Sequence, residues 1–218
     1  MDILHWFQNN FIHLDKTFAH IVALYGIWVY AILFAIIFCE TGLVITPFLP
    51  GDALLFAVGA FAAARPDGGI NYSVIVTLLS VAAILGNLVN FKLGGTIGSR
   101  IFKEEAIVLK KVYLTRAHIF FEKHGARAVI LARFLPIFRT LVPFVAGVAA
   151  MSPKKFTLYT ITGSLIWVFL MTTSGLFFGS MPWVQKHFEI VVIGIIFISM
   201  LPVAYEAAIH YFEARSKK

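Results

Sequence analysis

The stretch ETGLVITPFLPGD runs from Glu40 to Asp52 and places two acids at the ends of an apolar segment. Pro47, Pro50 and Gly51 interrupt the middle of this segment, so a straight membrane-spanning helix describes it poorly. The apolar residues 40–64 fit a re-entrant hairpin better, with two arms of about ten residues that each reach roughly 15 Å, half of the hydrocarbon thickness. The stretch therefore predicts a segment that enters a membrane and turns back.

A second broken apolar segment, residues 128–150, carries two bases in place of the two acids. Arg133 and Arg139 flank Pro136, and Pro143 and Gly147 follow. On a straight helix the two arginines would point about 120° apart. A break at Pro136 would let them converge, so we expect a second re-entrant hairpin that brings its two guanidinium groups together.

These four charges are the candidate functional residues. A charged side chain at the centre of a membrane helix costs roughly 2.5–3.5 kcal/mol on translocon scales, so four would cost on the order of 10 kcal/mol if each faced lipid alone. Pairing Glu40 and Asp52 with Arg133 and Arg139 in a shielded cavity near the midplane is the cheaper arrangement. The prolines and glycines are expected to shape the hairpin tips without contacting a substrate.

Composition places the whole chain in a membrane. Of 218 residues, 60% are hydrophobic and 13% are charged, and the mean hydropathy is +0.87, which is outside the range of soluble domains. No linker divides the chain, so it is predicted to be one all-α polytopic domain over residues 1–218. About four spanning helices are expected beside the two hairpins, at residues 21–39, 70–98, 155–179 and 189–211.

The amino-terminal residues 1–19 have mixed helical periodicity and are predicted to lie along the membrane surface as an amphipathic segment. No basic region or small-residue cleavage site accompanies them, so a removable signal peptide is not expected. Residues 99–127 hold seven bases and three acids and are predicted to form a basic loop.

The distribution of basic residues predicts how these segments are oriented in the membrane. With four spans and two re-entrant segments, both termini, the basic loop and the turn at 151–155 share one side. That side carries 13 of the 18 Lys and Arg residues, and the other side carries Arg65 and Lys186. The positive-inside rule then puts both termini in the cytoplasm. The net charge of +7 suits anionic lipid headgroups, and nucleic-acid binding is not expected.

The layout also makes the two halves inverted, as in many secondary transporters, because the hairpins enter from opposite sides. A weak echo in the sequence agrees. The motif PFxxG occurs from Pro47 to Gly51 and again from Pro143 to Gly147, and both pairs of residues are 96 positions apart.

The two charged segments together resemble the paired signature of the DedA family, within the VTT superfamily of membrane proteins. The resemblance rests on Glu40-x6-Pro47-x-x-Pro50-Gly51-Asp52 and on Arg133-Phe134-x-Pro136-x-x-Arg139-Thr140-x-x-Pro143-x-x-Ala146-Gly147. It implies a transporter of the bacterial inner membrane that moves a phosphate-bearing lipid, undecaprenyl phosphate or a phospholipid, often with proton dependence, and supports envelope homeostasis. The essential acids of the family map onto Glu40 and Asp52, and its essential arginines onto Arg133 and Arg139. Many relatives carry Asp where this chain has Asn87, so any role of that acid does not transfer.

The chemistry of the four charges suggests proton-coupled exchange. Arginine presents a planar donor fork that suits phosphate oxygens. An anionic headgroup could replace an acid as the partner of Arg133 or Arg139, and the released carboxylate of Glu40 or Asp52 would take up a proton. The alternatives are a proton-coupled carrier of a small ion or oxyanion, a non-transporting scaffold, and a static ion-pair network that only joins the hairpins.

Other classes of function lack support in the sequence. No G-x-S-x-G or H-E-x-x-H motif is present, so an enzyme and a metal site are not expected. No cofactor is implied, and the single Cys39 precludes an intrachain disulfide. The expected partners are membrane lipids with an anionic phosphate headgroup, and protons. Whether the chain forms a homo-oligomer stays open.

Overall fold

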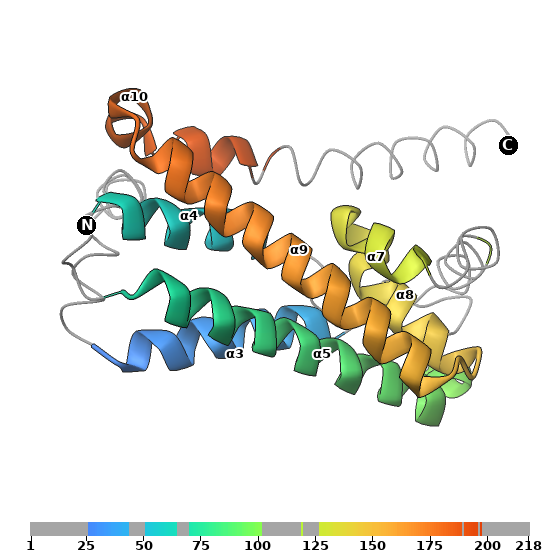
Figure 1. Cartoon of the computed structure of the whole chain (residues 1–218). Coiled ribbons are helices and arrows are strands. Elements are labelled where there is room, and N and C mark those ends of the chain that lie inside the picture. Colours follow the sequence, from blue (N-terminus) through green and yellow to red (C-terminus); the bar gives the residue numbers. More distant parts are fainter. Residues whose placement is uncertain are drawn as a thin grey trace, which may run out of the picture. The chain divides into compact units, whose positions relative to one another are not determined.

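The structure, a computed structural model, describes residues 26–43, 51–64, 70–101, 119, 127–188, 190–195 and 197. The described part is helical and contains no strand. Its elements, in chain order, are α3 (Trp28–Gly42), α4 (Gly51–Ala64), α5 (Tyr72–Ile101), α7 (Ala128–Leu131), η2 (Ala132–Phe134), α8 (Pro136–Val148), α9 (Pro153–Gly179) and α10 (Pro182–Lys186) (Figure 1).

Two of these helices are long and apolar enough to cross a membrane. Tyr72–Thr96 and Pro153–Gly179 have mean hydropathies of 2.1 and 1.6. At 1.5 Å per residue each exceeds the roughly 30 Å of a hydrocarbon core. They match the expected spans at 70–98 and 155–179. Of the expected spans at 21–39 and 189–211, the structure describes only part, and the surface segment at 1–19 and most of the basic loop at 99–127 lie outside the described residues.

The chain divides into two compact units, each described here by itself. The first comprises Met1–Ile36, Pro50–Leu79 and Val168–Phe197, and the second comprises Ile37–Leu49, Ser80–Trp167 and Ile198–Lys218. The boundaries fall within α3, α5 and α9, so each of these helices contributes residues to both units.

In the first unit, α4 packs closely against α9 (Figure 1). A Cβ atom on Gly59 would overlap the backbone oxygen of Thr172, and one on Gly175 would overlap the backbone oxygen of Phe56. Only glycine allows two helix backbones to approach so closely. The Tyr72 hydroxyl joins the start of α5 to the same region of α9 through a 2.8 Å hydrogen bond with Thr173 Oγ1.

The second unit repeats this kind of crossing between α8 and α5. A Cβ atom on Gly147 would overlap the backbone oxygen of Phe91, and one on Gly94 would overlap that of Phe144. Gly59 and Phe56 precede Gly147 and Phe144 by 88 positions each, and Thr172 and Gly175 follow Phe91 and Gly94 by 81 positions each. The contacts therefore match Gly147 with Gly59, whereas the sequence echo matched it with Gly51.

The chain turns back within the second broken segment. Residues 127–134 are helical, Leu135 is extended with φ −120° and ψ 111°, and α8 starts at Pro136. A proline disfavours helical geometry in the residue before it and is well accommodated in the first helical turn. α7 and η2 pack against α8, and the core beneath them contains Ala128, Val129, Ala132, Val142, Ala146 and Phe156. The predicted break at Pro136 is present, and its re-entry into a membrane remains a prediction.

In the first broken segment, the helices begin and end at other residues than predicted. The helix that was expected to end at residue 39 continues as α3 through Glu40 to Gly42, so Glu40 lies in the last turn of that helix and not in a hairpin arm. The expected second arm of this segment corresponds to α4, which starts at Gly51 with Asp52 in its first turn. An acid there is favourable at the positive end of the helix dipole. Pro47 and Pro50 lie outside the described residues.

Candidate functional site: a buried cluster of one acid and two arginines

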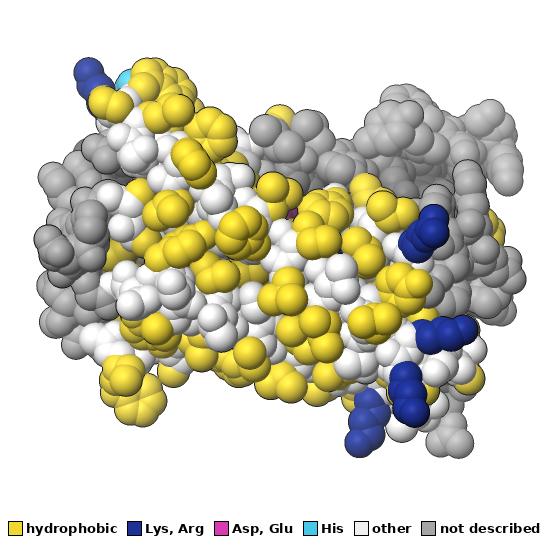
Figure 2. Space-filling view, in the orientation of Figure 1, with side chains coloured by type: hydrophobic (Ala, Val, Ile, Leu, Met, Phe, Trp, Pro, Cys, Tyr) yellow, Lys and Arg dark blue, Asp and Glu magenta, His cyan; other side chains and the backbone are white. Residues whose placement is uncertain are grey.

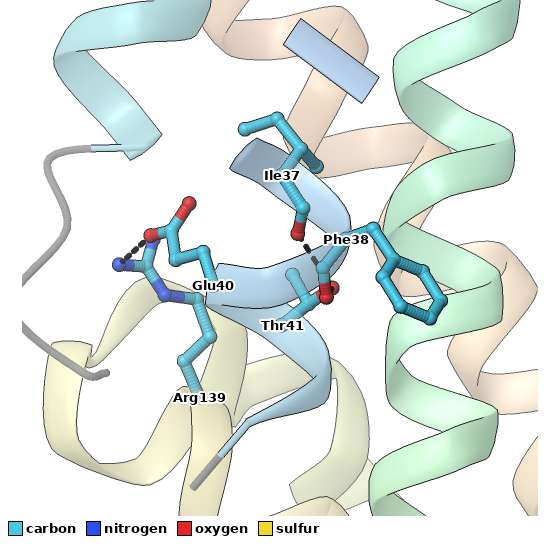
Figure 3. Close-up of polar contacts among 5 residues, drawn as sticks. All are labelled: Ile37, Phe38, Glu40, Thr41 and Arg139. Atoms are coloured by element: carbon cyan, nitrogen blue, oxygen red, sulfur yellow. Dashed lines mark hydrogen bonds and ion pairs between the residues drawn. The ribbon is translucent and has the colours of Figure 1, made fainter. Parts of the chain in front are cut away.

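The second unit contains an ion pair between α3 and α8. Arg139 Nη2 lies 2.6 Å from Glu40 Oε1, and both side chains are buried, at 3% and 0% exposure. Figure 3 shows the carboxylate of Glu40, on the last turn of α3, facing the guanidinium group of Arg139 on α8. In the same turn, Thr41 Oγ1 donates to the carbonyl oxygen of Ile37 at 2.8 Å, so its hydroxyl is satisfied within its own helix. One acid and one base from the two separate charged segments therefore meet.

The second arginine has a different environment. Arg133 in η2 is also buried, at 3% exposure. Its Nη2 donates to Ser164 Oγ at 2.5 Å, and Ser164 Oγ in turn donates to the backbone oxygen of Thr160 at 2.7 Å. Among the described residues, no hydrogen-bond partner accompanies Arg133 Nη1, which is buried. Ser164 of α9 thus binds one terminal nitrogen of this guanidinium group, and the other, Nη1, remains a buried donor for which no described residue provides an acceptor.

Trp167 of α9 joins the two arginines. It is fully buried, and the guanidinium carbons of Arg133 and Arg139 lie 5.9 Å and 5.3 Å from its ring centroid. An indole face attracts a cation at this range, by about 0.5–2 kcal/mol depending on desolvation. The ring therefore offsets part of the repulsion between two buried positive groups. The two arginines converge, as the break at Pro136 allows.

Asn90 of α5 ties the two charged segments together through their backbones. Its Nδ2 donates to the carbonyl oxygen of Thr41 at 3.2 Å and to that of Thr140 at 2.9 Å. These two residues directly follow Glu40 and Arg139 in the chain. Carbonyl groups in the last turn of a helix, such as that of Thr41, lack an intrahelical donor. Asn90 thus supplies a donor and fixes the register of the ion pair.

We predict that Asn90→Ala lowers the free energy of unfolding by about 1–3 kcal/mol, because two buried carbonyl groups lose a donor. Thr96→Ala is the matched control on the same helix. Thr96 is exposed and its Oγ1 bonds only to the helix's own backbone, so we expect a change within about 0.5 kcal/mol. Denaturation of both variants in detergent measures the difference. Equal stabilities would contradict the bridging role of Asn90.

The other predicted site residues are placed as follows. Asp52 is half-buried in the first turn of α4, in the first unit. Pro136 is the first residue of α8, and Pro143 lies inside that helix, which continues to Val148. Gly147 lies at the close crossing with α5.

Sequence reasoning missed Asn90, Gly163, Ser164 and Trp167 as parts of the site. A signal was available for Asn90, since a polar amide in the middle of an apolar span is costly unless it has partners. Ser164 and Gly163 resemble ordinary small residues of membrane helices, and Trp167 resembles any apolar packing residue. Among the described residues, no group of three His, Cys, Asp or Glu side chains is placed to hold a metal ion.

The chain matches the VTT domain over residues 49–177. Figure 2 shows apolar side chains spread over the described surface. Large apolar residues of α9 such as Leu158, Phe169 and Phe177 are exposed. Together with the two long apolar helices, these features define an all-helical membrane protein of the VTT class.

The relatives extend the match over nearly the whole chain. Protein DedA of Escherichia coli is 46% identical over 211 residues, which cover 96% of each chain. An uncharacterized membrane protein of Mycobacterium tuberculosis, Rv0364, is 40% identical over 83% of this chain and 79% of its own. Inner membrane protein YqjA of E. coli is 37% identical over 72% and 71%. The chain belongs to the DedA family of membrane proteins. No solved structure matches it.

Proposed function

We propose that this protein moves a phosphate-bearing lipid, undecaprenyl phosphate or a phospholipid, between the leaflets of the bacterial inner membrane. The observation that carries the proposal is Arg133. Its side chain is buried, and no described residue pairs with its Nη1. Desolvating a cation in this way is costly, and a phosphate oxygen is a strong acceptor for a guanidinium donor.

Proton coupling follows from charge balance at the ion pair. A phosphate bound by Arg133 adds negative charge to a buried site that already contains the Glu40 carboxylate. A nearby like charge disfavours the ionised form of a buried carboxyl group. In this proposal Glu40 therefore takes up a proton when the headgroup binds and releases it when the headgroup leaves.

The supporting architecture is an inverted repeat with two re-entrant segments and both termini in the cytoplasm. α4 and α8 have 14 and 13 residues, about 20 Å of helix each, which is too short to cross the membrane. The glycine crossings between α4 and α9 and between α8 and α5 recur at constant offsets of 88 and 81 positions. Such recurrence is typical of transporters built from two related halves.

The test is lipid movement by the purified protein in liposomes, measured with several labelled phosphate-bearing lipids. A chain that moves labelled lipid supports the proposal. A chain that moves only inorganic oxyanions is a small-ion carrier, and one that moves neither is a scaffold.

We predict that Glu40→Gln removes the pH dependence of lipid movement, because the amide cannot titrate. The rate is measured between about pH 5 and 8, with the wild-type chain and Asp52→Asn alongside. Loss of pH dependence in Asp52→Asn, with the wild-type profile kept in Glu40→Gln, would assign the coupling to the other acid and contradict this prediction.

A further inference from the structure

The two buried arginines of the second unit hold different kinds of partner. Arg139 is paired with a carboxylate, Glu40, at 2.6 Å. Arg133 is hydrogen-bonded to a neutral hydroxyl, that of Ser164. A carboxylate forms an ion pair with its arginine, whereas a hydroxyl is a neutral acceptor and adds no countercharge of its own.

α9 provides a fitted surface for Arg133. A Cβ atom on Gly163 would lie only 3.1 Å from Cδ and from Nε of Arg133, and 3.3 Å from the Cα of Ile130. The arginine stem thus lies against the bare backbone of α9. Gly163 and Ser164 precede Trp167 by four and three positions, so each is a neighbour of Trp167 on the helix surface. Gly163 lies against the Arg133 stem and Ser164 accepts from one terminal nitrogen, while the Trp167 ring centroid lies 5.9 Å from the guanidinium carbon.

We propose that Arg133 is the anion-binding arginine of the site and that Gly163, Ser164 and Trp167 position it, while Arg139 holds Glu40. This inference rests on the proposed function and assigns a different role to each of the two arginines. With Nη2 fixed by Ser164, Nη1 is oriented as a preformed donor. Its ligand is the oxyanion of a phosphate ester, carried by a lipid headgroup or by free phosphate.

Direct binding tests the proposal independently of transport. The full chain in detergent is titrated with inorganic phosphate by equilibrium dialysis, and in parallel with dihexanoyl phosphatidic acid, with dihexanoylglycerol as the uncharged control. Saturable binding of phosphate places the free anion at the site. Binding of the phosphatidic acid alone assigns the site to a lipid headgroup. Binding of neither overturns the proposal.

The positioning residues are tested by substitution. Ser164→Ala and Gly163→Ala are expected to raise the dissociation constant about tenfold, equivalent to about 1.4 kcal/mol. They should also raise the lipid concentration at half-maximal rate while leaving the maximal rate largely unchanged. Gly194→Ala is the matched control, since a Cβ atom there has no neighbour within 4 Å. Unchanged dissociation constants in both folded variants would overturn the proposal.

Trp167 itself reports where the anion binds. In a chain with Trp6, Trp28 and Trp183 replaced by phenylalanine, the emission of Trp167 should change on phosphate binding, because a neighbouring cation becomes neutralised. Arg133→Lys should abolish this change and Glu40→Gln should preserve it; the reverse pattern would assign the anion to Arg139. If phosphate binds as expected and no lipid moves in liposomes, the proposed function fails and this inference stands.

Discussion

Arg139→Ala is expected to reduce lipid movement by at least about a hundredfold and to lower the free energy of unfolding by about 3–5 kcal/mol. The magnitude follows from the burial of the pair, because removing Arg139 deprives the buried Glu40 of the countercharge 2.6 Å away in a low-dielectric environment. Glu40 has 0% exposure, so water cannot replace the lost guanidinium group without local opening. Liposome assays and denaturation in detergent measure the two effects.

A double variant separates the functional effect from the structural one. Replacing a buried ion pair by apolar side chains of similar volume is often neutral or stabilising. Glu40→Met with Arg139→Met should therefore recover most of the stability and none of the lipid movement. Lys92→Ala is the control for removing a base, because Lys92 is exposed on α5. Normal lipid movement in folded Arg139→Ala would sink the proposed role of the cluster.

The charged core of this site could be predicted in large part from the sequence. Two acids and two bases inside apolar segments imply pairing because isolated charges are costly there, and Glu40 does meet Arg139. The sequence did not distinguish between the two acids. Asp52 begins a separate helix of the first unit, and its pairing with the arginines remains a prediction. α3 extends past residue 39 and therefore carries Glu40 in its last turn.

The long helices could be predicted as well, since the apolar runs at 70–98 and 155–179 identify the helices observed at Tyr72–Thr96 and Pro153–Gly179. The positions at which the helices contact one another could not be predicted. They depend on backbone approaches at Gly59, Gly94, Gly147 and Gly175, and any glycine in an apolar helix looks the same in sequence. The repeated PFxxG motif pairs residues that are 96 positions apart. The residues at equivalent places in the two glycine crossings are instead 88 and 81 positions apart.

The supporting residues around the charges were the least predictable part. Trp167 and Ser164 belong to the site only because η2 places Arg133 against α9, where it contacts both residues. That contact depends on the short 3-10 turn and the extended Leu135 before Pro136. The proline predicts a break, but the direction of the chain after it is set by packing against α5 and α9.

Gly94→Ala is expected to cost about 3 kcal/mol or more in stability, at the upper end for overpacking a core. The added methyl group would overlap the backbone oxygen and carbonyl carbon of Phe144. A backbone cannot move aside as a flexible side chain does, so α5 and α8 would have to separate, and the segment that carries Arg139 would move with α8. Lipid movement should fall together with stability.

The neighbouring glycine supplies a control for that substitution. A Cβ atom on Gly95 would lie 3.4 Å from the backbone oxygen of Gly147, an ordinary contact. Gly95→Ala should therefore be neutral or gain up to about 1 kcal/mol from the better helix propensity of alanine. Thermal unfolding of the two variants in the same detergent measures the contrast. Equal melting temperatures would show that the crossing of α5 and α8 is looser than its geometry indicates, and would remove the physical basis for matching it with the crossing of α4 and α9.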